Sequence, residues 1–161
     1  MDDFPNLKNP FHFLATLGGI GNIPFAPGTF GSIFSWLIFI FLSHFVNMFY
    51  VTFIGIFLSI WICEMASKNL THKDHRSIVI DELIGIWIAL LPVLYLADTQ
   101  KERIVYAIAA LLFFRLIDIF KPFPVSYFDE NFKNGTGIVI DDLIAGVMAI
   151  IPSYIILTLL A

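Results

Sequence analysis

The sequence predicts an all-α integral membrane protein with about five transmembrane helices, a glycine-rich N-terminal loop, and its motif-bearing loops on the cytoplasmic side. Of its 161 residues, 58% are hydrophobic and only 14% are charged, whereas about a quarter of the residues in soluble domains are charged. The mean hydropathy is +0.86. Because each span takes about 20 residues, five spans use up the chain, and we expect residues 1–161 to form a single membrane domain.

Five apolar segments mark the expected spans. They run from about Phe30 to Val46, Phe49 to Glu64, Ile80 to Ala97, Ile104 to Phe120, and Ile140 to the end of the chain. Ahead of them, residues 10–20 form a Phe-rich segment that is too short to span, so we expect it to lie at the interface or to re-enter the membrane. Residues 18–32 hold four glycines before Phe30 and two prolines, which favours a shaped loop over a regular helix.

The alternation of five spans places three loops on one side of the membrane, which we call the motif face. These loops are the glycine-rich segment, Met65–Ser77 and Lys121–Gly137. The basic residues assigned to the motif face are Lys8, Lys68, Lys73, Arg76, Arg115, Lys121 and Lys133, against Lys101 and Arg103 on the other side. Because cytoplasmic loops are enriched in Lys and Arg, we expect the motif face and the N-terminus to be cytoplasmic.

A short stretch of the chain occurs twice. Residues 78–84 have the sequence IVIDELI, and residues 138–144 have the sequence IVIDDLI. Each copy sets two adjacent acids at the beginning of an apolar helix. The four acids are Asp81, Glu82, Asp141 and Asp142. A lone acid there would be interpreted as a helix cap, but one cap suffices, so two acids in tandem, twice, indicate a functional site.

The four acids predict a metal site. The small residues Gly85 and Gly146 lie one turn further on and would let the two helices approach closely. Neighbouring residues on a helix point about 100° apart, so we expect each pair to divide ligand and supporting roles. Gathered carboxylates repel one another unless a cation lies between them. An all-oxygen ligand set suits Mg²⁺ or Mn²⁺.

Basic and hydroxyl side chains near the acids are candidates for phosphate binding. Arg115 and Asp118 share one helix face, which Lys121 continues; this spacing fits an intrahelical ion pair with a snorkelling lysine equally well, although an arginine fork suits phosphate oxygens. Thr29 and Ser32 would either cap the first span or hold a phosphate with the adjacent glycines. His72 and His75 border the first acidic pair, where a loop histidine is more often simply solvated.

Longer motifs, in a fixed order, resemble those of a known family. They are Asn9–His12, Pro27–Ser32, Asp74–His75 with Ser77–Glu82, Phe114–Pro122 and Gly137–Asp142. In these motifs the chain resembles the phosphatidylglycerophosphatase A family of bacterial inner-membrane lipid phosphatases. The resemblance implies Mg²⁺-dependent hydrolysis of phosphatidylglycerophosphate to phosphatidylglycerol and inorganic phosphate in the cytoplasmic membrane, with no nucleic acid as partner.

The leading hypothesis assigns roles to these residues. Metal ligands would be Asp81, Glu82, Asp141 and Asp142, binding one or two Mg²⁺ ions for in-line attack by water, with an Asp nucleophile left open. Charge on the phosphoryl group would be neutralised by Arg115 and Lys121. Asp118 would orient Arg115 or join the metal shell, with Asp129 a further candidate for either role. The headgroup would be bound by Thr29, Ser32 and His75.

A second hypothesis is a small cation transporter in which the repeated acids form an ion path. Transporter sites are expected near the bilayer midplane. Here both acidic pairs lie at helix starts, the two repeats run in the same direction, and Arg115 and Lys121 lie on the same side. These features favour headgroup chemistry.

Overall fold

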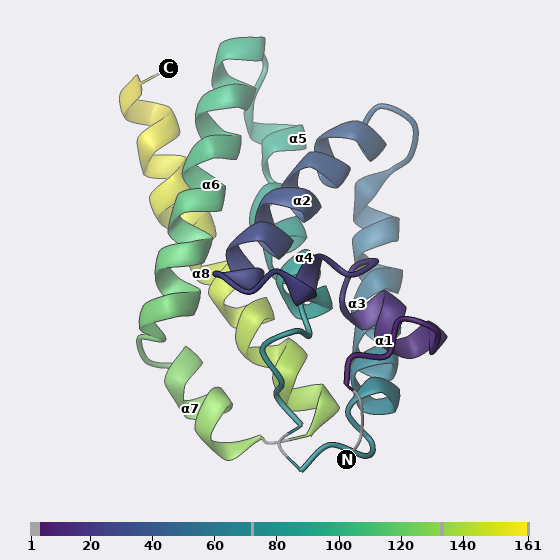
Figure 1. Ribbon diagram of the computed structural model, residues 1–161. Helices are drawn as coiled ribbons and strands as arrows, with labels where there is room; N and C mark the ends of the chain where they lie inside the picture. The colour runs from purple at the N-terminus through teal and green to yellow at the C-terminus, as the bar shows by residue number, and fades with distance from the viewer. Residues whose placement is uncertain (1–3, 72, 133, 161) are drawn as a thin grey trace.

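The computed structural model describes residues 4–71, 73–132 and 134–160, and within them it contains helices and no strand (Figure 1). The long helices are α2 (Pro27–Leu42), α3 (Met48–Ala66), α4 (Ile80–Leu90), α6 (Gln100–Phe120) and α8 (Gly135–Leu160). The short elements are α1 (Pro10–Ala15), the 3₁₀ turn η1 (Ile20–Asn22), α5 (Val93–Leu96) and α7 (Val125–Asn131). The all-α prediction is confirmed. His72 and Lys133, both assigned above to the motif face, lie outside the described residues.

Each predicted span contains one long helix, but several ends differ from the prediction. Helix α2 begins at Pro27, within the segment predicted as loop, because proline is favoured in the first turn, where its missing N–H is not needed. The third predicted span is broken after Leu90, and Pro92 separates α4 from α5. Helix α8 begins at Gly135, ahead of the predicted Ile140, and the Gly135 N–H donates to the Glu64 carboxylate at 2.8 Å.

The long helices alternate in direction. In Figure 1, α3 and α6 run downward, whereas α4 and α8 begin low in the view and run upward. The short helix α7 lies at the lower end, between the end of α6 and the start of α8. The beginnings of α4 and α8 therefore lie toward the same end of the molecule as the end of α6, and the repeated acids share that end.

Helix α4 is mostly buried and packs closely on α8. A Cβ atom on Gly146 would overlap the Gly85 carbonyl oxygen, and one on Gly85 would lie 2.8 Å from the Asp142 carbonyl oxygen. The close approach that Gly85 and Gly146 predicted is therefore confirmed. Because the two backbones almost touch here, the acids one turn before these glycines are brought near one another.

Hydrogen bonds from aromatic side chains join the helices through the apolar core. The bonds run from Trp87 Nε1 to Ser35 O at 2.9 Å, from Trp36 Nε1 to Ala107 O at 2.8 Å, and from Tyr106 Oη to Ala89 O at 3.2 Å. Each donor finds a carbonyl on another helix, as buried polar groups require. These bonds fix α2, α4 and α6 relative to one another at the positions where they pack.

The outer faces of the long helices are apolar. Examples of exposed side chains are Phe41 on α2, Phe57 on α3, Leu112 on α6 and Ile151 on α8. Within the described residues, α3 and α8 are long and apolar enough to cross a membrane, and α2 is apolar but shorter. An apolar outer surface of this extent is typical of a protein that meets lipid or a partner there.

Candidate active site

A cavity of about 740 Å³ lies where α4 and α8 begin and α6 ends, beside α7 and the loop that leads into α4. Among the residues that the structure describes, seven carboxylates line it: Asp74, Asp81, Glu82, Asp118, Asp129, Asp141 and Asp142. The described bases that line it are Lys73, Arg76 and Lys121. All four repeated acids thus contribute to one cavity, and acids outnumber bases around it.

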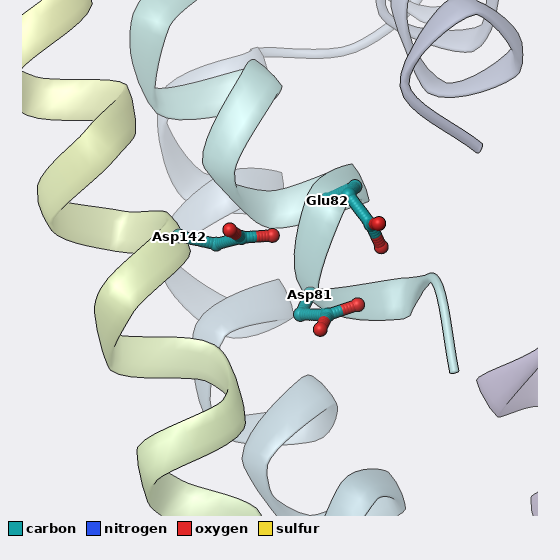
Figure 2. A group of neighbouring side chains, drawn as sticks. All are labelled: Asp81, Glu82 and Asp142. Atoms are coloured by element: carbon teal, nitrogen blue, oxygen red, sulfur yellow. The ribbon is translucent and has the colours of Figure 1, made fainter. Parts of the chain in front are cut away.

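Three of the four repeated acids form a compact group. One oxygen from each of Asp81, Glu82 and Asp142 can be chosen so that all three lie within 4.8 Å of one another. Figure 2 shows Asp142 pointing from α8 toward α4, which carries Asp81 and Glu82. Asp81 and Asp142 are buried, and Glu82 is 12% exposed at its side chain. Like charges held this close and this deep repel one another strongly.

The group fits a divalent cation. Among the residues that the structure describes, no hydrogen-bond partner reaches the buried oxygens Asp81 Oδ1 and Glu82 Oε2. Buried carboxylate oxygens without partners are costly, and a metal ion would satisfy them. Oxygen donors alone are the ligands that Mg²⁺ and Mn²⁺ accept in proteins.

Asp141 lies apart from this group and pairs with Lys121. The ammonium of Lys121 lies 2.8 Å from Asp141 Oδ2 and 2.6 Å from Asp129 Oδ1. Burial alone would lower the pKa of Lys121, but its hydrogen bonds to the two carboxylates outweigh burial and raise that pKa above its ordinary value. The lysine therefore stays charged in the cavity. Asp129, expected to assist Arg115 or the metal, pairs with Lys121 instead.

Arg115 lies beside Glu82 and Asp118, which both line the cavity. Its Nη1 atom donates to Asp118 Oδ2 at 2.6 Å and to Ser32 Oγ at 3.3 Å, and its Nη2 atom donates to Thr29 Oγ1 at 3.5 Å. The distance from Nη1 to Glu82 Oε1 is 4.0 Å. The intrahelical pair of Arg115 with Asp118 is therefore present. Within the described part of the chain, Asp118 lines the cavity, whereas Arg115, Thr29 and Ser32 do not.

The start of α2 packs behind the first acidic pair. A Cβ atom on Gly28 would overlap Glu82 Oε1 and would lie 3.3 Å from Arg115 Nη2. The Ser32 hydroxyl donates to the Gly28 carbonyl at 2.8 Å, within the helix, and forms no N-terminal cap. This part of the glycine-rich segment thus lets α2 approach Glu82 closely enough for Arg115 to bridge the two helices.

His75 anchors the loop that leads into α4. Its Nδ1 atom accepts from the Ser77 N–H at 3.2 Å, its carbonyl accepts from the Ile78 N–H at 2.7 Å, and its ring meets Phe4 edge-on at 4.9 Å. Burial lowers the pKa of His75, and the neighbouring Arg76 adds to this effect. Among the described residues, His75 is not part of the cavity lining.

The bases Lys73 and Arg76 do line the cavity, although the sequence did not single them out. Lys73 pairs with Glu64 at 3.3 Å. Arg76 is exposed, and no ion pair to it occurs among the described residues. Their position in a charged loop that leads to the first acidic pair is the feature of the sequence that could have predicted their place in the cavity.

Comparison with known proteins shows which family the chain resembles. The family model of phosphatidylglycerophosphatase A matches residues 13–157. The Escherichia coli (strain K12) protein named phosphatidylglycerophosphatase A is 38% identical over 146 residues, which cover 89% of this chain and 81% of that protein. The Haemophilus influenzae protein of the same name is 37% identical over 152 residues, covering 92% of this chain and 90% of that protein.

A third relative has a different name. A Bacteroides thetaiotaomicron protein, provisionally named phosphatidylinositol-3-phosphatase, is 34% identical over 155 residues, which cover 90% of this chain and 94% of that protein. No solved structure matches the chain. From the family match over most of its length and from its close relatives, the chain belongs to the phosphatidylglycerophosphatase A family.

Proposed function

We propose that the chain hydrolyses the terminal phosphomonoester of phosphatidylglycerophosphate and releases phosphatidylglycerol and inorganic phosphate. Two relatives that cover most of the chain are named for this activity. The structural observation that carries the proposal is the group of Asp81, Glu82 and Asp142 in the same cavity as Lys121. Acids alone would repel a phosphate, whereas acids that hold a cation beside a charged lysine would bind one.

Asp81, Glu82 and Asp142 would hold Mg²⁺ or Mn²⁺. The unpartnered buried oxygens of Asp81 and Glu82, and the all-oxygen chemistry of the three acids, support this assignment. A bound cation would polarise the phosphoryl oxygens and make a water molecule more acidic. The fourth repeated acid, Asp141, would act mainly through Lys121, because one of its oxygens already accepts from that ammonium.

The remaining polar residues would orient the acids and the phosphate. Lys121 would donate to the phosphate, whose P–O bond to glycerol breaks as water attacks from the opposite side. Arg115, paired with Asp118 and near Glu82, would hold these carboxylates in place. Thr29 and Ser32 would act through Arg115, and His75 would hold the loop that carries Arg76. Arg115, Thr29, Ser32 and His75 would thus support the site without lining the cavity.

We also infer that the protein lies in the bacterial cytoplasmic membrane with five spans. The spans would be α2, α3, α4 with α5, α6 and α8. The apolar outer faces and the alternating helix directions support this inference (Figure 1), as do the two helices of sufficient length and hydropathy. The excess of Lys and Arg on the motif face favours a cytoplasmic N-terminus and active site.

A phosphate-release assay tests the proposed function. Purified protein in mixed micelles is given phosphatidylglycerophosphate, phosphatidic acid or phosphatidylinositol 3-phosphate, with Mg²⁺ or with EDTA. The last lipid is included because of the name of the Bacteroides relative. We expect fastest release from phosphatidylglycerophosphate, loss with EDTA and recovery with excess Mg²⁺. Absence of release in Mg²⁺ would refute the assignment, and cation flux in liposomes without lipid hydrolysis would favour the transporter hypothesis.

A further inference from the structure

Lys121 occupies an unusual backbone position. It ends α6 with φ 42° and ψ 57°, in the left-handed region, where helices usually place glycine. Pro122 follows, and a residue before proline is itself disfavoured in compact backbone conformations. Two local preferences thus oppose a lysine here. Strained backbone positions cluster at active sites and ligand-binding sites. The strain at Lys121 therefore points to a role for its side chain in the cavity.

The ammonium of Lys121 is held from two sides. Asp129 on α7 and Asp141 on α8 accept hydrogen bonds from it at 2.6 and 2.8 Å. A lysine ammonium has three N–H donors, and within the described part of the chain two of them are used. Because Lys121 lines the cavity and its side chain is 30% exposed, the third donor is available to a ligand there.

The helix that carries Asp129 is fixed against α8. The rings of Phe128 and Phe132 stack with centroids 5.6 Å apart, and the Phe132 N–H donates to the Phe128 carbonyl at 3.0 Å. A Cβ atom on Gly137 would overlap the Phe132 carbonyl, so the end of α7 lies directly on the first turn of α8. Asp129 therefore projects from a helix whose end packs against α8, and it does not belong to the group formed by Asp81, Glu82 and Asp142.

We propose that Asp129 is a positioning residue that holds the Lys121 ammonium between itself and Asp141, so that the third N–H of Lys121 faces the phosphate of the substrate. Without Asp129, the ammonium would be held by Asp141 alone and would lose its direction. The inference rests on the proposed function, because it assumes that a phosphate enters the cavity. The positioning role of Asp129 can be tested without knowing the lipid substrate, because it should also affect the binding of inorganic phosphate.

The test uses the full-length protein with Asp129→Asn, Asp129→Glu, Lys121→Ala and the double variant Asp129→Asn with Lys121→Ala. One arm measures inorganic phosphate binding in the presence of Mg²⁺ by calorimetry, and the other measures kcat and KM for phosphatidylglycerophosphate. Glu130→Gln is the matched control, since Glu130 is the next residue on α7, is exposed and does not line the cavity. Thermal melting in detergent checks that each variant is folded.

We expect Asp129→Asn to weaken phosphate binding and to lower kcat/KM by about tenfold, because it replaces a charge-assisted hydrogen bond with a neutral one. Asp129→Glu should restore most of both, and Glu130→Gln should match the wild type. In the Lys121→Ala background, Asp129→Asn should add almost nothing, because the two residues act as one unit.

Three results would overturn the inference: wild-type phosphate binding by Asp129→Asn, the same loss from Asp129→Asn when Lys121 is absent, or no recovery with Asp129→Glu. If the wild type hydrolyses no phosphatidylglycerophosphate but phosphate binding follows the expected pattern, the positioning role is supported and the lipid assignment is rejected. The two arms therefore separate the two failures.

Discussion

The two acidic pairs have almost the same sequence but different surroundings. Asp81 and Glu82 lie in the first turn of α4, and both contribute oxygens to the three-carboxylate group. Asp141 and Asp142 lie further inside α8, which begins at Gly135. There Asp142 joins the same group, whereas Asp141 turns to Lys121. A repeated motif therefore does not imply repeated roles, because the neighbouring helices decide what each acid contacts.

Position within the helix explains the difference. Inside a regular helix, adjacent side chains point about 100° apart, so Asp141 and Asp142 face different neighbours: the end of α6 on one side and α4 on the other. At the start of α4, Arg115 lies behind Glu82, at 4.0 Å. Its positive charge would help to keep the first pair together, whereas the positive charge beside the second pair, the Lys121 ammonium, contacts Asp141, which lies outside the three-carboxylate group.

The largest expected effect separates the two acids of the second pair. Asp142→Asn should lower kcat by about 10³-fold, because it removes a proposed metal ligand. Asp141→Asn should lower kcat by only about tenfold, because it removes the negative charge that holds the Lys121 ammonium and leaves a weaker, neutral acceptor. Phosphate release at saturating Mg²⁺ measures both. Equal losses in the two variants would mean that the pair is not divided as described.

The second largest loss of activity is expected when α4 and α8, which carry the two acidic pairs, are moved apart. Gly146→Ala places a Cβ against the backbone of Gly85, so α4 and α8 must move apart, and we expect kcat to fall by about 10²-fold. Gly55→Ala is the matched control, because its Cβ would meet side chains and no backbone: the flexible end of Ile84 at 2.8 Å and the ring of Trp87 at 3.9 Å. Kinetics and thermal melting of both variants test this, and a Gly146→Ala enzyme with wild-type turnover would contradict it.

A smaller loss of activity is expected when the contact between α2 and the first acidic pair is disturbed. The Cβ atom of Gly28→Ala would overlap Glu82 Oε1 and displace the Glu82 carboxylate. Because Glu82 is a proposed metal ligand, we expect the Mg²⁺ concentration for half-maximal activity to rise by about tenfold. Ser43→Ala, at the other end of α2, serves as control, because among the described residues its hydroxyl bonds only to the Ile40 carbonyl. An unchanged Mg²⁺ requirement in Gly28→Ala would show that α2 does not support Glu82.

The smallest expected effect concerns the edge of the cavity. Arg76→Ala should raise KM for phosphatidylglycerophosphate by about threefold, with kcat preserved, because exposed charges contribute modestly to binding an anionic ligand. Lys68→Ala removes a positive charge from the same loop without altering the cavity lining, so it should leave KM unchanged. Equal effects of the two substitutions would indicate general attraction to the lipid surface.

The sequence predicts much of this architecture. Long apolar stretches locate the five long helices, because a buried or lipid-facing helix must be apolar over its whole length. The small residues Gly85 and Gly146 predict the contact between α4 and α8. The predicted third span does not include the break at Pro92, although proline interrupts helices.

Other features depend on contacts between distant residues. Helix α8 begins early, where Glu64 accepts from the Gly135 N–H. Arg115 turns toward Thr29 and Ser32, and Lys121 turns toward Asp129 and Asp141. Local pattern shows which residues are charged, but the packing of the helices selects their partners.

The division of the second acidic pair can be tested most directly by metal binding. Mn²⁺ binding to the wild type, Asp141→Asn and Asp142→Asn can be followed by the loss of the free-ion electron paramagnetic resonance signal. We expect Asp142→Asn to weaken Mn²⁺ binding by about 10²-fold, whereas Asp141→Asn should bind Mn²⁺ like the wild type. Loss of Mn²⁺ binding in Asp141→Asn, or its retention in Asp142→Asn, would mean that the two acids do not divide their roles in this way.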